Sequence, residues 1–391
     1  MIATCINQNQ TYCKLIRSHF DDVYNFLGEF ITLKEIIDQM TNLEMIYTHC
    51  GNHHADDTTA TAFIVALKSL IDSIYGRYFN YDGFCKRVSG ITLDIRKKEK
   101  NGEAIIYDIG YGKFDHHDHA TQKKRRPKTI NGVIDISVPY SSFGLLWQCY
   151  GKAYINLEYL VRYNEFPDPV LVAKYFEEFD SINIIPIDAR DNGIYNLVES
   201  NYSETIANFN AFRSTDQNVP IFKVIDPNYK RISKDKVFNF ACDFADRTLY
   251  GWTENIIRSI YDDAWVSKIL ENQDKNDTIL VVDRLIRPSD AVFVSNPNIR
   301  YIVYPNNRKL GCYYVRCARR SDRYDQYLFD PDRKELYGPG VTYIQGNGRL
   351  VNALSRSAAI QACRINDEMI DHSLHINPSA QTQFEKGSVV M

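Results

Sequence analysis

The chain has 391 residues, of which 44% are apolar, 13% aromatic and 24% charged, and its formal net charge is -3 at pH 7. This composition excludes an intrinsically disordered chain and supports a large hydrophobic core, while the length favours two domains or one domain with a large appendage. The small negative charge excludes a uniformly basic surface for nucleic acid, although a local basic groove stays compatible with it.

Residues 1–42 predict a helical N-terminal extension, because DDVYNFLGEFITLKEIIDQM carries apolar residues at helix-like spacing. The start of the chain shows neither an arginine-rich amphipathic segment nor an apolar secretion signal, and no apolar run approaches the ~20 residues that span a bilayer. The nine cysteines are scattered without a paired motif, which favours reduced thiols. We therefore expect a cytoplasmic protein that does not bind membranes.

Residues 43–205 predict a parallel-sheet α/β domain. LEMIYT (43–48) is a strand-like segment ending at His49, and TTATAFIVALKSLIDSIYG predicts a helix with Asp56 or Asp57 at its N-terminus. Further strands are expected at 90–96 and 103–110, and helices at 141–151 and 172–183. Polar residues placed after such strands would gather at the sheet edge where open α/β folds hold their ligands.

The remainder of the chain predicts a helical connecting region and a smaller second α/β domain. Residues 206–275 are polar and aromatic, with a helical pattern near 236–270. Strands are expected at 278–293, 300–306 and 312–318, and a glycine loop is expected to open a helix within 346–365. We assign 276–370 to the C-terminal domain and 371–391 to a weakly ordered tail.

Histidines and aspartates are concentrated in four fragments: THCGNHHADD (48–57), YDIG (107–110), FDHHDH (114–119) and DARDNG (188–193). A mixture of imidazoles and carboxylates without thiolates suits a hydrolytic Mn²⁺, Mg²⁺ or Zn²⁺ centre. The candidate ligands are His49, His54, Asp56, Asp108, His116 and Asp191. Asp191 precedes Asn-Gly, so a turn is expected to expose its carboxylate, and Asp188 is the competing choice.

Charge balance favours two divalent cations over one. Three carboxylates with neutral imidazoles leave two cations with a surplus of about one positive charge, which favours hydroxide and then a phosphate oxygen. Asp108 ends a predicted buried strand, so its two oxygens are suited to bridging the cations. Because the metals lower the pKa of a bound water, no Ser, Cys or Lys nucleophile is required.

The order and spacing of these fragments resemble the DHH phosphoesterase superfamily, and most closely its Myg-type (melanocyte proliferating gene) branch. The matching segments are THCGNHHADDT, DIG, FDHH and DARDNGI, with SSFG at 141–144, VVDR at 281–284 and YP at 304–305. The resemblance covers residues 43–365. It implies a two-domain phosphoesterase with the active site in the cleft between the domains, associated with Mn²⁺ and similar to 3′–5′ RNA exonucleases.

The resemblance also implies roles for individual residues. One cation would be held by His49, His54 and Asp108, and the other by Asp56, Asp108, His116 and Asp191. His117 would contact the substrate phosphate, and Asp115 would orient its neighbours. His117, Asp115 and Arg349 are therefore the candidate catalytic residues.

Two basic features bear on the substrate. Related sequences carry a His-Ala-Ser-Gly-Phe-like loop where this chain has QGNGR (345–349), so the phosphate contact either passes to Arg349 or is lost. Gly348, Asn347 and Arg316 are the other candidate substrate-binding residues of this domain. The run KKRRPK (123–128) either guides a phosphate backbone to the metals or is a solvated loop, with a nuclear localisation signal as a weaker third alternative.

The sequence thus predicts a Mn²⁺-dependent phosphodiesterase, acting as a 3′–5′ exonuclease on RNA or short oligonucleotides. The first alternative is a small-molecule phosphohydrolase that acts on pyrophosphate, a nucleotide or a dinucleotide. The second is a binding protein that keeps its metals but has weakened catalysis. A homodimer is compatible with each of these predictions.

Overall fold

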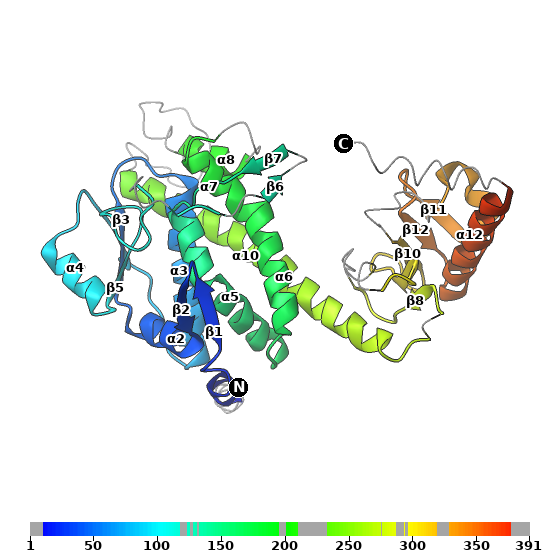
Figure 1. The fold of residues 1–391 in the computed structure, drawn as a ribbon, viewed down its shortest axis with the longest axis horizontal. Helices are drawn as coiled ribbons and strands as arrows, with labels where there is room; N and C mark the ends of the chain where they lie inside the picture. The colour runs from blue at the N-terminus through cyan, green and yellow to red at the C-terminus, as the bar shows by residue number, and fades with distance from the viewer. Residues whose placement is uncertain are drawn as a thin grey trace, which may run out of the picture. The chain divides into compact units, whose positions relative to one another are not determined.

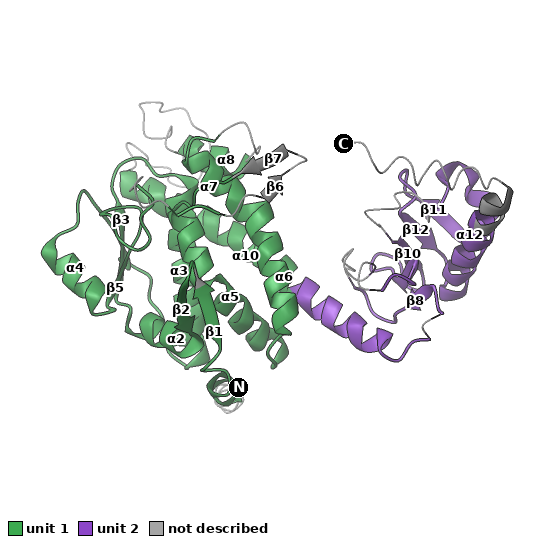
Figure 2. Ribbon diagram, viewed as in Figure 1, with its two compact units in different colours: residues 1–257 green, residues 258–391 purple. Residues whose placement is uncertain are grey.

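The structure is a computed structural model, and it describes residues 11–117, 123–125, 128–130, 133–194, 201–209, 233–274, 276–286, 293, 296–318 and 328–376. The chain forms two compact units, Met1–Ile257 and Arg258–Met391, which Figure 2 colours separately. The boundary between them falls within the long helix α10 (Lys234–Leu270). The last turns of α10 carry Val266 into the core of the second unit.

The N-terminal segment differs from the expected continuous helix. Residues 11–17 are helical, and they are followed by β1 (Val23–Phe26), β2 (Glu29–Thr32) and α2 (Leu33–Asn42). The two strands pair antiparallel, and the turn between them places Leu27 and Gly28 at positive φ (51° and 98°), as a two-residue hairpin requires. Thr32 and Glu35 then form a capping box that starts α2. The turn and the cap override the helical spacing of the apolar residues.

The first unit contains a three-stranded parallel sheet. Its strands are β3 (Met45–His49), β4 (Cys85–Val88) and β5 (Ala104–Ile106), in the order β4-β3-β5. The strands expected at 43–48 and 103–110 are confirmed. The strand expected at 90–96 is wrong, because α4 (Leu93–Lys100) begins there: the Thr92 hydroxyl caps it, and its residues are mostly good helix formers.

Helices make up most of the first unit (Figure 1), and they contribute most of its buried apolar residues. The helices are α3 (Ala55–Ile74), α5 (Ser142–Tyr163), α6 (Pro169–Phe179), α7 (Ile185–Asp191) and α8 (Asn201–Phe209). A short hairpin is formed by β6 (Lys128–Ile130) and β7 (Val133–Ile136). Trp147 of α5 stacks on Phe179 at 4.3 Å between ring centroids and lies 5.4 Å from Phe63 of α3. These aromatic contacts fix α3, α5 and α6 against one another, as expected for the helices predicted there.

The second unit is a smaller α/β body with a mixed five-stranded sheet. Its elements are β8 (Ile279–Val281), β9 (Tyr301–Pro305), β10 (Tyr313–Cys317), a 3-10 helix (Pro331–Tyr337), β11 (Val341–Ile344), β12 (Leu350–Ala353) and α12 (Arg356–Ile376). The strand order is β11-β12-β10-β9-β8, and only the β8–β9 pair is parallel. The strands expected in 300–306 and 312–318 are confirmed. Of the segment 278–293, residues 279–281 form a strand, 282–286 do not, and 287–292 lie outside the described residues.

The glycine loop of this unit does not open a helix. Residues 345–349 form the turn between β11 and β12, and β12 separates this turn from α12. The predicted helix start is therefore wrong at this loop, because the apolar residues after Arg349 complete the sheet first. Of the expected tail, 371–376 continue α12 and 377–391 lie outside the described residues. No helix in the described part of the chain has the length and apolar character needed to cross a membrane.

Candidate metal centre

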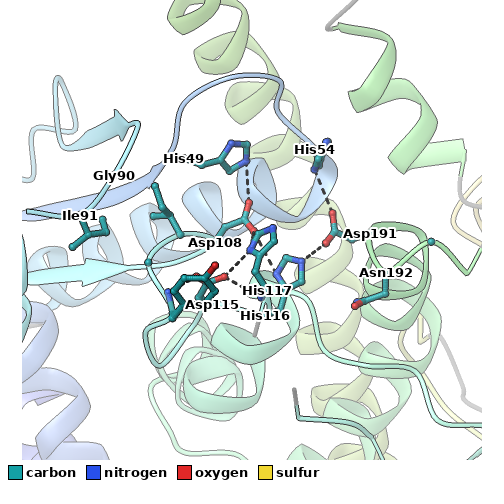
Figure 3. A pocket seen from close by; sticks show the side chains of 14 residues that line it. His49, His54, Gly90, Ile91, Asp108, Asp115, His116, His117, Asp191 and Asn192 are labelled. Atoms are coloured by element: carbon teal, nitrogen blue, oxygen red, sulfur yellow. Dashed lines mark hydrogen bonds and ion pairs between the residues drawn. The ribbon is translucent and has the colours of Figure 1, made fainter. Parts of the chain in front are cut away.

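A cavity of about 860 Å³ in the first unit is lined by five of the six predicted ligands, which come from separate segments (Figure 3). His49 is the last residue of β3, and Asp108 lies two residues beyond β5 with a left-handed backbone (φ 58°). His54 immediately precedes α3, His116 lies in the loop after Asp108, and Asp191 is the last residue of α7. Only the first two of these five ligands follow strands, so helix ends supply part of the site.

The imidazoles and carboxylates are already paired with one another. His49 Nε2 lies 3.0 Å from Asp108 Oδ2, and His116 Nε2 lies 2.7 Å from Asp191 Oδ2. His116 Nδ1 is 3.4 Å from Asp108 Oδ1, and His54 Nδ1 is 3.5 Å from Asp191 Oδ1. Asp108 therefore touches histidines on both of its oxygens, which is the position of a bridging ligand. The Asp191 side chain is only 7% exposed, so the expectation of an exposed carboxylate is wrong.

Three groups of side chains among the described residues have ligand atoms close enough to hold a cation, within 4.8 Å of one another. The groups are His49–Asp57–Asp108, His54–Asp56–Asp191 and Asp108–Asp115–His116–His117. Every candidate ligand from the sequence falls in one of them. The groups differ from the implied ligand sets, since Asp57 takes the place beside His49 and Asp108 that the resemblance gave to His54, and His54 joins Asp56 and Asp191. His116 is grouped with Asp108, Asp115 and His117.

Asp56 is the clearest sign that a cation belongs here. Its side chain is completely buried in the first turn of α3, and neither carboxylate oxygen has a hydrogen-bond donor within the described ranges. Burial raises the pKa of Asp56, and the negative charges of Asp108 and Asp191 raise it further. A buried carboxylate without a donor is costly, and a divalent cation would remove this cost. The donor set thus fits a hard or borderline divalent metal.

The field of the carboxylates also acts on the histidines. Burial lowers the pKa of His49, but hydrogen bonds and charge from Asp108 and Asp57 outweigh it and raise the pKa to about 11. Burial raises the pKa of Asp191, but hydrogen bonds from His116 and His54 hold it below its usual value. Without metal, the cage therefore holds protons that a divalent cation would displace.

Asp115 holds His117 at the edge of the same cavity. One Asp115 oxygen lies 2.7 Å from His117 Nδ1 and also accepts from the His117 backbone N–H at 3.1 Å. The other oxygen accepts from the Tyr111 backbone N–H at 2.6 Å. The Asp115 carboxylate is buried, whereas the His117 side chain is 55% exposed. This is the contact that a carboxylate positioning an exposed imidazole would make.

A family comparison establishes the relationship. The model of MYG1_exonuc, described as an uncharacterised protein family (UPF0160), matches residues 45–327. The chain belongs to this family. The matched region contains all six candidate ligands and most of the first unit, and it agrees with the Myg-type resemblance of the sequence motifs.

Two other comparisons add little to the MYG1_exonuc assignment. The sequence has no match among curated proteins. Among solved structures, the chain is similar to the crystal structure of RecJ in complex with Mn²⁺ from Thermus thermophilus, with 13% identity and a TM-score of 0.24. The match covers 93% of this chain and 61% of the RecJ chain, so this chain spans about three fifths of that length. A similarity of this size establishes neither a shared arrangement nor a shared activity.

The SSFG segment (141–144) contacts the candidate ligands His116 and Asp108 through the Ser142 side chain. The Ser142 hydroxyl lies 3.1 Å from His116 Nδ1 and 3.4 Å from Asp108 Oδ1. The Ser141 hydroxyl donates to Asp188, and a side chain at Gly144 would collide with that same carboxylate. Asp188 is thus a buried structural group beneath the site and belongs to none of the three ligand groups.

The residues of the basic run 123–128 differ in their exposure to solvent. Arg125 is buried and forms ion pairs with Asp188 and with Asp180, the latter at 2.8 Å. Lys123 and Lys124 are exposed, whereas 126–127 lie outside the described residues. Arg125 is therefore not available to guide a phosphate backbone, and the part of the prediction that includes it is wrong.

The predicted substrate residues of the second unit lie together at one end of its sheet. Arg316 on β10 pairs in register with Leu350 on β12, directly after Arg349. Asn347 accepts from the Arg349 backbone N–H at 3.2 Å. Gly348 has a φ of 68°, and a side chain there would collide with the backbone of Phe329. The glycine is thus explained by the turn itself, and a substrate role for this loop stays a prediction.

Sequence reasoning missed Asp57 as a candidate ligand. One Asp57 oxygen accepts from the His54 backbone N–H at 2.8 Å, and the other lies 3.3 Å from His49 Nε2. The first contact follows from the position of Asp57 at the N-terminus of α3, and this position was predicted. The contact with His49 depends on how β3 and α3 pack together. Two successive aspartates after a histidine were the available signal.

Proposed function

We propose that this chain is a metal-dependent phosphoesterase whose catalytic centre lies in the cavity of the first unit. The observation that carries the proposal is the buried Asp56 carboxylate, which lacks a donor and lies beside Asp108 and Asp191 in a cage of histidines. Divalent cations bound there would lower the pKa of a water molecule and neutralise phosphate oxygens. The MYG1_exonuc name of the family supports a hydrolytic function.

Two cations are proposed because ligand groups lie on both sides of Asp108. Asp108 would be shared, since each of its oxygens already faces a histidine. One cation would be held by His49 with Asp57 or His54. The other would be held by Asp56 and Asp191, which share a ligand group, together with His116, whose Nε2 lies 2.7 Å from Asp191 Oδ2. Ser142 would keep His116 and Asp108 in place through its hydroxyl.

His117 is the proposed contact to the substrate phosphate. Its ring is half exposed in the cavity, and the Asp115 carboxylate fixes its orientation through Nδ1. The hydrogen bond to Asp115 raises the pKa of His117, so the ring can donate from its other nitrogen to a phosphate oxygen. Asp115 acts through His117 and is therefore a positioning residue.

We further propose Mn²⁺ as the cation and RNA or a short oligonucleotide, degraded from 3′ to 5′, as the substrate. Arg349, Asn347, Gly348 and Arg316 of the second unit would bind the substrate phosphate. This part of the proposal is supported by the family name and by the proximity of these residues at one end of the sheet.

A small-molecule phosphohydrolase is the second candidate, and one observation favours it. The described residues that line the cavity include no lysine or arginine. Long nucleic acids are bound largely through such side chains, whereas a small phosphate ester held by two cations needs fewer of them.

The test is hydrolysis with and without Mn²⁺, using end-labelled RNA, a dinucleotide and pyrophosphate, and comparing the native chain with Asp108→Asn. Asp94→Asn on the exposed start of α4 is the matched control. Mn²⁺-dependent release of mononucleotides that Asp108→Asn abolishes is the expected result. Release from pyrophosphate or the dinucleotide alone would replace the exonuclease with the second candidate. Bound Mn²⁺ without hydrolysis of any substrate would instead indicate a binding protein.

A further inference from the structure

Tyr111 is an exposed aromatic residue on the wall of the metal cavity. It is 74% exposed and lines the cavity together with His117 and Asp115. Among the described lining residues, it is the one aromatic side chain apart from the histidines. A large ring left in solvent at the edge of a cavity is a candidate surface for a ligand.

The backbone of Tyr111 is strained, and its ring does not compensate for that strain. Its φ is 58°, in the left-handed region that a bulky residue rarely adopts and that glycine adopts freely. Because the ring is exposed, its burial offsets little of the free-energy cost of this backbone conformation. Strained residues of this kind concentrate at functional sites, where the surrounding structure holds them.

Neighbouring groups hold this strained loop in place. The Arg96 guanidinium donates to the Gly110 carbonyl, and the Asp108 N–H donates to the Phe114 carbonyl at 3.2 Å. The Asp115 carboxylate that orients His117 also accepts from the Tyr111 N–H at 2.6 Å. A single carboxylate therefore ties the Tyr111 backbone to the proposed phosphate-binding imidazole, and the ring is presented from a fixed position.

The surroundings of Tyr111 suit a flat, uncharged group. Ile91 would be in contact with any side chain at Gly110, so it forms an apolar wall beside the tyrosine loop. Figure 3 places Gly90 and Ile91 at one end of the cavity and Asp191 at the other. His117 lies between these two ends. A phosphate at the carboxylate and histidine end would thus leave the adjoining part of a nucleotide near the apolar end.

We propose that Tyr111 stacks on a base of the substrate and thereby selects base-bearing phosphodiesters; this inference rests on the proposed function. Stacking on an aromatic ring binds every base and carries little sequence preference. It would also supply affinity in a cavity whose described lining has no lysine or arginine. The substrate class is therefore a nucleotide or single-stranded nucleic acid, bound without base selectivity.

The experiment compares a short RNA with an otherwise identical oligonucleotide whose terminal positions are abasic, both in Mn²⁺. For Tyr111→Gly, kcat/KM on the RNA should fall about 5- to 100-fold, mainly through KM, with no change on the abasic substrate. Tyr111→Phe should retain the native values on both. The melting temperature of Tyr111→Gly should rise, because glycine relieves the left-handed backbone. A purely structural tyrosine would not combine higher stability with a base-dependent loss.

Tyr78→Ala is the matched control, since Tyr78 is 91% exposed in the same unit and does not line the cavity. Equal kcat/KM of the native chain on both oligonucleotides would overturn the stacking role and leave metal-dependent hydrolysis standing. Absence of hydrolysis of either, in the native chain as in Asp108→Asn, would overturn the proposed function and the inference together. A change in oligomeric state on Tyr111→Gly would assign the ring to a protein contact and overturn its role in substrate binding.

Discussion

At the residue scale, Asp56 shows the conflict between stability and metal binding most directly. Its carboxylate is buried without a donor, and its neighbours Asp108 and Asp191 are also acidic. Without metal, this buried acidic group is costly whether it is charged or takes up a proton, and cation binding would relieve that cost. A residue that destabilises the empty fold and is satisfied only by a ligand marks a functional site.

We expect Asp56→Asn to melt at the same or a higher temperature than the native chain in EDTA, because a neutral amide replaces a buried acidic group surrounded by other carboxylates. The native chain should gain stability on adding Mn²⁺, by about 2.7 kcal/mol at a hundredfold excess over Kd, and the variant should lose most of this gain. Thermal melts with EDTA or Mn²⁺ measure both effects, with Asp94→Asn as the control. A variant that keeps the full Mn²⁺ gain would remove Asp56 from the ligand set.

His49 predicts how the metal-free fold responds to alkaline pH. Its pKa is raised to about 11 in the fold by Asp108 and Asp57, above the 6.5 of a free histidine. A raised pKa contributes stability below the unfolded value, and this contribution is lost as the pH rises towards about 11. The free energy of unfolding in EDTA should therefore fall over this range, and His49→Gln should show a smaller fall. Urea unfolding of both proteins at several pH values gives the free energy of unfolding as a function of pH. The same fall in the native chain and in His49→Gln would contradict this prediction.

At the element scale, α5 and α7 approach each other so closely that only glycine fits between them. Gly144 of α5 lies against the Asp188 carboxylate of α7. This carboxylate also accepts a hydrogen bond from the Ser141 hydroxyl and forms an ion pair with Arg125. Asp191 is on the same short helix as Asp188. The packing of these two helices thus determines where one of the metal ligands lies.

Gly144→Ala should destabilise the chain by about 1–3 kcal/mol, because the added methyl group overpacks a buried contact. It should also weaken Mn²⁺ binding by moving α7. Gly251→Ala is the matched control, since nothing surrounds that position in α10 and alanine there should stabilise by about 0.5–1 kcal/mol. Urea unfolding measures the stabilities. Equal effects of the two substitutions would show that Gly144 is not a contact point.

At the scale of the whole molecule, the two units have separate proposed tasks. The candidate metal ligands among the described residues all belong to the first unit, whereas Arg316 and Arg349 belong to the second. The first unit would bind metal without help from the second. Arg316 and Arg349 of the second unit are proposed to contact substrate phosphate, and the described lining of the first unit's cavity has no lysine or arginine.

Arg349→Ala should therefore raise KM for an RNA substrate about tenfold, since it removes a charged hydrogen bond to phosphate. The Mn²⁺-induced rise in melting temperature should stay unchanged. Arg308→Ala, an exposed arginine of the same unit, should change neither quantity. Steady-state kinetics and thermal melts provide the two readouts. An unchanged KM would contradict the proposed phosphate contact of Arg349 and would favour the small-molecule phosphohydrolase.

The amino-acid sequence alone determined the chemistry of the candidate site. The types of ligand, their order and the strands ending near His49 and Asp108 all follow from local patterns, because ligand preference and strand propensity belong to single residues and short segments. The six candidate ligands named from these patterns all fall in the groups that the fold gathers, and Asp57 joins them there.

Only the tertiary structure decided which of these groups meet and which polar residues are withdrawn from function. Asp57 reaches His49 because β3 and α3 come together, Arg125 is buried because Asp180 and Asp188 surround it, and the 345–349 turn is part of a sheet. Each outcome depends on contacts between segments far apart in the chain. Local spacing cannot encode such contacts, since the burial that rewards them exists only after the segments have packed.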